Sequence, residues 1–250
     1  MRTSNTEYEK KKLSSRSKTD ASISAKNDVK ISETAGGFKG LPMPHIMDNG
    51  IVTGNIENKY DAKNPVARRL MSGFMRCVRE LIEPLRDDID SIVEVGCGEG
   101  DLAVRLASMS IADEIRACDF SDRIIGLAKQ RHTSSPVRFY VRNVYDLNET
   151  DRADLVVCCE VLEHLQRPTE ALDRIKQITA KYCVLSVPNE PLWRILNMLR
   201  GKYLGHFGNT PGHVNHWNKK AFIRLIGDYF DIVQQKKPLP WLMVLCKRKV

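Results

Sequence analysis

Glycines alternate with carboxylates in one short stretch of the sequence, "VEVGCGEGDLA" (93–103). The glycines are Gly96, Gly98 and Gly100, and the carboxylates are Glu94, Glu99 and Asp101. The apolar run before the turn predicts a buried strand, and the glycines predict a sharp turn whose backbone can approach a ligand closely. A phosphate beside these carboxylates, in a partly desolvated site, would cost on the order of one to several kcal/mol. The turn therefore favours a cationic ligand.

Two common nucleotide motifs do not fit this turn. A dinucleotide fingerprint needs a third glycine where Asp101 stands, and the GK[ST] ending of a phosphate loop is absent. We therefore expect an amine or a sulfonium at the turn, with an adenosine further along. Asp119 ends the next predicted strand, 19 residues after Gly100, where an acid can accept hydrogen bonds from both hydroxyls of a ribose. Capping a helix or turn is the alternative role for Asp119.

A second group of residues with chemical potential lies in "CCEVLEHL" (158–165). Glu160, Glu163 and His164 stand at i, i+3 and i+4, so they would share one face of a helix that started there. That face could bind a divalent metal, or His164 could act as a general base. The alternative is that Glu163 and His164 cap the turn. Further along, "GHVNHW" (212–217) supplies His213 and His216, one of which could face His164, although a pair of histidines in a loop more often has a structural role.

The elements that would position these residues alternate between strand and helix. Predicted strands cover 91–96, 114–119, 137–143, 154–160 and 182–188, and predicted helices cover about 100–109, 122–132 and 168–180. Such alternation is typical of βαβ units with a parallel sheet. A helix at 218–229 then leads to strands at 230–237 and 241–249. The link between these last strands is too short for a crossover, so they must be antiparallel.

The remaining segments divide the chain. Residues 1–36 are polar and predict a disordered tail, and 37–64 contain breakers and look irregular. Residues 37–250 form the predicted catalytic-type domain, with a helical lead at 60–88, whose helix spans 67–85, and an insertion at 190–217. Apolar and basic residues alternate in this insertion. It could be a lid over an apolar substrate, a helix on a membrane surface, or core packing.

Composition narrows the class of protein. The chain has 250 residues and a net charge of +8, which permits contact with acidic partners, but no basic stripe interleaved with aromatics indicates nucleic-acid binding. Its seven cysteines are scattered, without a CxxC pair, so we expect reduced thiols in a cytoplasmic protein. Neither a secretory signal nor a membrane-spanning run is apparent.

Three motifs, in this order, resemble those of class I S-adenosylmethionine-dependent methyltransferases: "VEVGCGEG", "ACDFS" and "DLVVCCEVLEHL". The resemblance covers roughly residues 60–250. It implies a Rossmann-like α/β fold with a seven-stranded, mostly parallel sheet in the order 3-2-1-4-5-7-6 and an antiparallel last strand. It also implies a cofactor site on Glu94, Gly96, Cys97, Gly98, Gly100, Asp119, Phe120, Asn143, Val144 and Cys159. Within it, Asp119 would hold the ribose, and Asn143 and Val144 would border the adenine.

The sequence thus predicts a methyltransferase that uses S-adenosylmethionine, and O-methylation of a small, aromatic or lipid-like metabolite. The ubiquinone-type O-methyltransferases are the nearest specific resemblance. The predicted catalytic residues are His164, Glu160 and His216. Because "EVLEHL" also occurs in methyltransferases without a metal, no metal ligand is assigned. Two alternatives stay open: a metal-dependent RNA 2′-O-methyltransferase, since ExxEH also resembles the small-RNA enzymes, and a non-catalytic scaffold with this fold.

Overall fold

A computed structural model describes residues 46–48, 51–53 and 64–249. The predicted disordered tail lies outside these residues. Strands β1 (Ile46–Asp48) and β2 (Ile51–Thr53) pair antiparallel. The prediction that 37–64 is irregular is therefore wrong for these two strands. The Asn49–Gly50 pair between them in the sequence is a frequent hairpin signal, and it could have indicated them.

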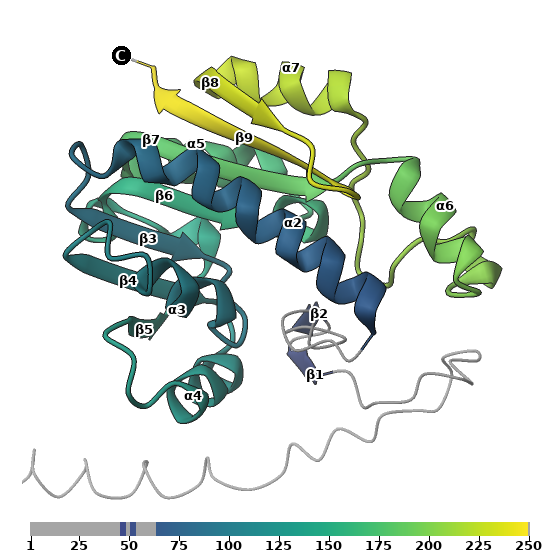
Figure 1. The fold of residues 1–250 in the computed structure, drawn as a ribbon, viewed down its shortest axis with the longest axis horizontal. Coiled ribbons are helices and arrows are strands. Elements are labelled where there is room, and N and C mark those ends of the chain that lie inside the picture. The colour runs from purple at the N-terminus through teal and green to yellow at the C-terminus, as the bar shows by residue number, and fades with distance from the viewer. Residues whose placement is uncertain (1–45, 49–50, 54–63, 250) are drawn as a thin grey trace, which may run out of the picture. The chain divides into compact units, whose positions relative to one another are not determined.

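The main sheet has seven strands, and Figure 1 shows them side by side. They are β3 (Ser91–Val95), β4 (Glu114–Asp119), β5 (Arg138–Val141), β6 (Ala153–Cys159), β7 (Thr179–Pro188), β8 (Phe230–Lys236) and β9 (Trp241–Arg248). Their order is β5-β4-β3-β6-β7-β9-β8, which confirms the predicted order. The first five strands are parallel, and β9 runs antiparallel to both β7 and β8.

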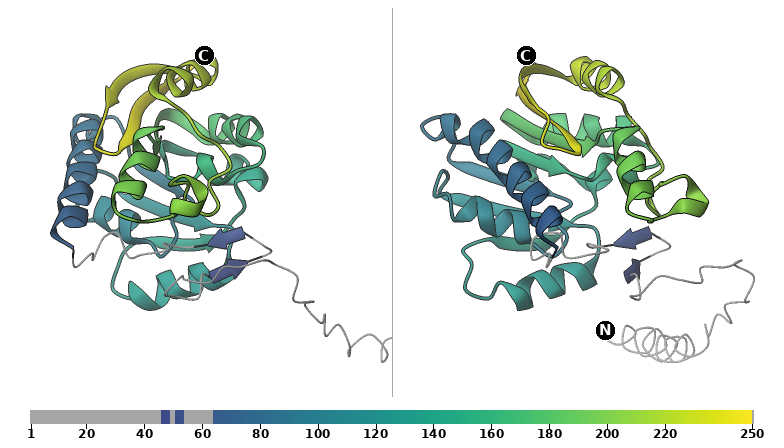
Figure 2. Two further views of the ribbon diagram at one scale, coloured as in Figure 1. Left: turned by 90° about the vertical axis from the view of Figure 1, so that its right-hand side faces the viewer. Right: turned by 45° about the vertical axis from the view of Figure 1, so that its right-hand side comes forward.

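Helices cover both faces of this sheet. They are α2 (Pro65–Ile82), α3 (Asp101–Ala107), α4 (Asp122–Arg131), α5 (Pro168–Ile178) and α7 (Lys219–Tyr229), whereas α6 (Leu192–Leu199) lies at the strand ends (Figure 2). Alternate residues of β3 point to opposite faces, as its geometry requires. Ile92 packs in the cluster that α2, α3 and α4 complete, and Val93 and Val95 pack in the cluster that α5 and α7 complete. The sheet is thus buried on both sides, and its strand ends are left to bind ligands.

Helix α2 begins at Pro65, two residues before the predicted start at 67. The Asn64 side chain accepts a hydrogen bond from the Val66 N–H, and Pro65 occupies the first helical turn. Its buried residues recur at helical spacing and pack against the sheet; they are Met71, Phe74, Val78, Leu81 and Ile82. Because α2 ends at Ile82, the segment up to Leu85 is a separate 3-10 turn and not part of the predicted 67–85 helix.

The insertion between β7 and α7 lies beyond the carboxyl ends of the parallel strands. Figure 2 (left) looks onto this end and shows α6 in front of the sheet. Among the described helices, none combines the length and the apolar character that a bilayer span needs. All seven cysteines are thiols, as expected, and five of them are buried.

Candidate functional site

The glycine turn follows β3 directly. The backbone N–H groups of Gly96 and Cys97 both donate to the Cys118 carbonyl, at 2.8 and 2.9 Å, which fixes the turn against β4. Gly96 has a φ of +75°, and a Cβ atom there would collide with the Val161 side chain. Both the backbone conformation and the available space therefore require glycine at this position.

Gly100 ends the turn and begins α3. Its φ is +84°, and a Cβ atom there would lie 2.6 Å from the Phe139 ring. The turn is thus held between Val161 on one side and Phe139 on the other. Within the turn, Gly96 and Gly98 are partly exposed, and the binding of a ligand there stays a prediction.

Asp119 lies beside this turn, at the end of β4. Its two carboxylate oxygens accept hydrogen bonds from the backbone N–H groups of Gly98 and Ser121, both at 3.1 Å. The side chain is 8% exposed, and burial raises its pKa although these hydrogen bonds act in the opposite direction. Each carboxylate oxygen has a second lone pair, so both can still accept from a ribose hydroxyl.

Glu94 lies within β3 and is 4% exposed. Burial raises the pKa of its carboxyl well above the usual value, a hydrogen bond from the Ala103 backbone lowers it, and the nearby Asp119 and Asp101 raise it further. Its Oε2 atom has no hydrogen-bond partner among the described residues. A buried acceptor without a donor is costly, and an ammonium group would supply both the donor and the charge. This atom therefore suits a cationic ligand.

The turn is less acidic than the sequence implies. Asp101 forms an ion pair with Arg131, with 3.3 Å between Oδ2 and Nη1. The backbone carbonyl of Glu99 lies 3.1 Å from His132 Nε2, a contact that leaves the charge of the Glu99 carboxylate unchanged. Arg131 and His132 come from the end of α4, which sequence spacing does not connect to the turn. The paired Asp101 therefore attracts a cationic ligand less than Glu94 and Asp119 do.

Replacing Glu94 by glutamine should raise the stability of the ligand-free protein at neutral pH. A raised carboxyl pKa means that the Glu94 carboxyl loses its proton less readily in the folded protein than in the unfolded chain. The folded protein therefore loses stability as the pH rises from the unfolded-state pKa toward the folded-state pKa. Urea unfolding should show Glu94→Gln to be more stable than the wild type near neutral pH and equal to it in acid. A loss of stability at neutral pH would show that the carboxylate is compensated within the fold.

The predicted adenine side lies next to Asp119. The Arg142 backbone N–H donates to the Asp119 carbonyl at 2.9 Å, so the segment after β5 is tied to the end of β4. Asn143 caps the following turn with its side-chain oxygen, which accepts from the Tyr145 N–H at 3.1 Å, and this leaves its amide nitrogen as the donor toward a base. Val144 is buried, and Phe120, which follows Asp119, is partly exposed. The assignment of these residues to the adenine side stays a prediction.

The two cysteines assigned to the cofactor site are not nucleophiles. Burial raises the pKa of the Cys97 thiol, and it also raises that of the Cys159 thiol. Both thiols therefore stay protonated at neutral pH, and thiols in this state line a pocket without attacking a ligand.

The expectation that Glu160, Glu163 and His164 share a helical face is wrong. Glu160 has a φ of +60°, and only a three-residue 3-10 turn, Leu162–His164, follows it. The Glu160 carboxylate turns toward β7 and β9, where it accepts hydrogen bonds from Ser186 Oγ at 3.3 Å and from Trp241 Nε1 at 2.5 Å. A catalytic role for Glu160 is therefore less well supported than its position in the motif implied.

Glu163 and His164 instead lie with His213. One potential ligand atom from each of these three residues lies within 4.8 Å of the others. Glu163 is 1% exposed and His213 8% exposed. The His213 loop is held in place because the Val214 and Asn215 N–H groups donate to the Glu163 carbonyl, at 2.9 and 3.0 Å. A carboxylate and two imidazoles so arranged could bind a divalent cation or pass a proton.

The contacts of His164 define which of its nitrogens is basic. Its Nδ1 atom lies 3.0 Å from the Gly212 carbonyl oxygen, which can only accept a hydrogen bond. Nδ1 must therefore carry the proton, and in the neutral ring the lone pair is on Nε2. Nε2 lies 4.0 Å from Glu163 Oε1. This carboxylate would stabilise the imidazolium formed when Nε2 accepts a proton.

His216 pairs with Glu190 and not with His164. Its Nδ1 atom is 3.6 Å from Glu190 Oε1, and this pairing lowers the pKa of the Glu190 carboxyl, which burial raises by more. His213, not His216, packs against His164, with ring centroids 4.8 Å apart. The sequence contains both histidines in one loop, and nothing in their spacing distinguished them.

Aromatic rings extend from this histidine pair. Trp193 of α6 stacks on His213 and also contacts Trp241, with centroids 5.9 Å apart in each case. The Trp193 indole donates to Thr210 Oγ1 at 2.8 Å. Sequence reasoning did not assign these tryptophans to the site. Their signal is weak, because a lone tryptophan is most often a core residue.

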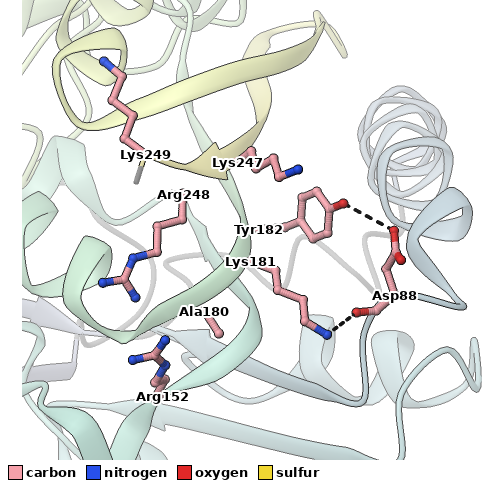
Figure 3. Close-up of a pocket in the computed structure, with 8 residues that line it drawn as sticks. All are labelled: Asp88, Arg152, Ala180, Lys181, Tyr182, Lys247, Arg248 and Lys249. Atoms are coloured by element: carbon pink, nitrogen blue, oxygen red, sulfur yellow. Dashed lines mark hydrogen bonds between the residues drawn. The ribbon is translucent and has the colours of Figure 1, made fainter.

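A separate pocket lies at the other end of the sheet, where the parallel strands begin (Figure 3). Cationic side chains line most of it; they are Arg152, Lys181, Lys247, Arg248 and Lys249. Asp88 is the acid in its lining, and its side chain accepts from Tyr182 while its carbonyl accepts from Lys181. No histidine or glycine turn lines this pocket, so it is not the site of the predicted chemistry.

Known proteins resemble this chain in sequence and in fold. The family described as "Methyltransferase domain" matches residues 92–181, from β3 into β7. The mitochondrial ubiquinone biosynthesis O-methyltransferase of Candida albicans is 30% identical over 95 residues, which are 36% of this chain and 29% of that protein. The protein of the same name from Saccharomyces cerevisiae is 28% identical over 104 residues, 38% and 33% of the two chains. This chain thus spans about a third of the length of these curated relatives.

Among solved structures, the magnesium protoporphyrin IX methyltransferase of Synechocystis PCC 6803, with bound SAH, superposes with a TM-score of 0.58. The two sequences are 18% identical, and the superposition covers 76% of this chain and 91% of that one. This likeness concerns the fold. Together with the sheet order, the family match over residues 92–181 and the curated relatives support the assignment of the chain as a class I S-adenosylmethionine-dependent methyltransferase.

Proposed function

We propose that this protein transfers the methyl group of S-adenosylmethionine to an oxygen atom of a small aromatic or lipid-like acceptor. The choice of oxygen depends on His164. Its Nδ1–H donates a hydrogen bond to the Gly212 carbonyl, so the basic lone pair of the neutral ring is on Nε2. A hydroxyl is a poor nucleophile until a base takes its proton. An N-methyltransferase acting on a free amine would not need such a base.

The cofactor would lie along the carboxyl ends of β3, β4 and β5. Glu94 would bind the ammonium group of the methionine part, and Asp119 would accept hydrogen bonds from the ribose hydroxyls. The remaining members of the proposed site are Gly96, Cys97, Gly98, Gly100, Phe120, Asn143, Val144 and Cys159. S-adenosylmethionine carries positive charge at both its sulfonium and its ammonium. The buried Glu94 carboxylate would offset part of that charge.

In the proposed reaction, the acceptor oxygen attacks the methyl carbon while the bond from that carbon to sulfur breaks. His164 Nε2 takes the proton of the hydroxyl, and sulfur leaves as a neutral thioether. Holding the oxygen and the methyl group in line can contribute about 7–11 kcal/mol, and general-base catalysis can add about 10²–10⁴-fold. Glu163 stabilises the charged His164 that results.

The walls of the site support an apolar acceptor. Trp193 and Trp241 provide aromatic surface beside the histidine pair. Aromatic rings of this kind bind other rings by offset or edge-on contacts. The curated relatives named above carry O-methyltransferase in their names, which is consistent with this choice.

A second candidate is metal-dependent 2′-O-methylation of RNA. The observation in its favour is the cluster of Glu163, His164 and His213, which can offer three ligands to a divalent cation. One feature counts against it, because Glu160, which the motif would supply as a further ligand, is bonded to Trp241.

A transfer assay separates the two candidates. The protein is incubated with methyl-labelled S-adenosylmethionine and either catechol-type phenols or RNA, with and without EDTA. We expect label on the phenolic oxygen, and little effect of EDTA. Label on RNA that disappears with EDTA would overturn the proposal. Absence of cofactor binding would favour a non-catalytic scaffold instead.

A further inference from the structure

The insertion at 190–217 exposes apolar side chains to an unusual degree. Ten large apolar residues are exposed in the described part of the chain, and six of them lie between 195 and 214. They are Ile195, Met198, Leu199, Leu204, Phe207 and Val214. The most exposed are Leu199 at 78% and Phe207 at 73%. Single exposed apolar residues are normal, but a gathering of this kind marks an interaction surface.

This surface belongs to a hairpin whose polar backbone groups are paired internally. The Lys202 N–H donates to the Asn197 carbonyl at 2.8 Å, and the Gly208 N–H donates to the Tyr203 carbonyl at 2.9 Å. Across the hairpin, Asn197 Nδ2 donates to the Gly208 carbonyl, also at 2.9 Å. Internal pairing of this kind lets a segment enter an apolar phase without leaving its backbone groups unsatisfied.

The charge around the hairpin has a single sign. Residues 191–227 contain no aspartate or glutamate, and their cations are Arg194, Arg200, Lys202, Lys219, Lys220 and Arg224. Arg200 is exposed directly beside Leu199. An acidic protein or an anionic bilayer would complement this charge. The protruding aliphatic and aromatic side chains lie on the short helix α6 and on the turn after it. Short amphipathic elements of this kind enter the surface of a bilayer without crossing it.

We infer that the hairpin of residues 192–208 docks on an anionic membrane surface, with Leu199, Leu204 and Phe207 inserted among the lipids. Arg200 and Lys202 then lie at the level of the phosphate headgroups. The histidine pair lies at the base of the same insertion, so a docked protein would hold the mouth of its site against the bilayer. The docking needs no catalysis, so its test is independent of the proposed methyl transfer.

Flotation of the full-length protein with lipid vesicles tests this inference. One set of vesicles contains phosphatidylcholine alone, and the other contains phosphatidylcholine with phosphatidylglycerol. We expect binding to the anionic vesicles, weaker binding at high salt because the headgroup attraction is screened, and little binding to the neutral ones. The double variant Leu199→Glu with Phe207→Glu should reduce binding by about tenfold or more, because it places two carboxylates in the apolar layer.

Matched controls separate insertion from net charge. Val66 and Val233 are also exposed, at 63% and 57%, but lie on α2 and β8. The double variant Val66→Glu with Val233→Glu changes net charge equally, and it should bind vesicles almost as the wild type does. The cations Lys10, Lys11 and Lys12, outside the described residues, are a second source of attraction, so their triple replacement by glutamine is tested alongside.

Several outcomes would overturn the inference. They are no binding to anionic vesicles, equal losses in the two glutamate variants, and binding that disappears only when the three N-terminal lysines are replaced. Self-association of the wild type without vesicles, abolished by Leu199→Glu with Phe207→Glu, would assign the surface to a second copy of the chain. Circular dichroism of each variant would show that a loss of binding is not a loss of folding.

Discussion

Replacing Asp119 by alanine should weaken the binding of S-adenosylmethionine by about 10²–10⁴-fold. The change removes a buried carboxylate that would accept two ribose hydrogen bonds, and hydrogen bonds to a charged group contribute about 1.5–3 kcal/mol each. It also removes the acceptors of the Gly98 and Ser121 N–H groups, which hold the turn in position. Isothermal titration calorimetry of the wild type and the variant measures the difference directly.

Asp122→Asn is the matched control for this change. Asp122 lies three residues further along in the first turn of α4, where its side chain is exposed. It has no predicted contact with the cofactor, so its affinity should stay close to that of the wild type. An unchanged affinity in Asp119→Ala would contradict the assignment of the ribose site. Equal losses of affinity in both variants would indicate a general effect of charge.

Replacing His164 by alanine should lower kcat by about 10²–10⁴-fold and leave the affinity for the cofactor nearly unchanged. The imidazole would act on the acceptor and not on the cofactor, so only the chemical step should slow. The wild-type rate should also fall as the pH drops through the range in which imidazoles gain a proton, because a protonated Nε2 cannot accept the proton of the acceptor hydroxyl. This dependence should disappear in the variant.

His216→Ala provides the comparison for His164. It lies in the same segment as His213, but it pairs with Glu190 and does not contact His164 in the structure. We expect its kcat to change little. If His216→Ala instead lost as much activity as His164→Ala, with the pH dependence of the wild type removed, the assignment of the base would be wrong. Repeating both assays with added Mg²⁺ would show whether the loss reflects a metal site.

The fold could be predicted to a large extent, because its signals are local and repeated. Apolar strands separated by amphipathic helices indicate a parallel sheet, and the short Pro238–Pro240 link requires β8 and β9 to be antiparallel. The glycine turn is equally local, since Gly96 and Gly100 have positive φ values that favour glycine. Each of these features is thus determined by residues that lie next to one another in the sequence.

The base and its surroundings could not be predicted, because their contacts cross the fold. The left-handed backbone of Glu160 breaks the helical spacing on which the ExxEH argument depended. His213 meets His164 only because the loop after α6 bonds to the Glu163 carbonyl, 50 residues earlier in the chain. In the same way, Arg131 reaches Asp101 from the end of α4 and offsets its charge. The folded turn therefore has less net negative charge than its sequence alone suggests.

A crystal structure of the full chain with S-adenosylhomocysteine tests the central claim most directly. The account predicts the ribose hydroxyls on Asp119, the ammonium group at Glu94 Oε2, and the sulfur atom facing the space beside His164 Nε2. A cofactor bound elsewhere would contradict the cofactor site. A sulfur atom that faces away from the histidine pair would contradict the proposed base.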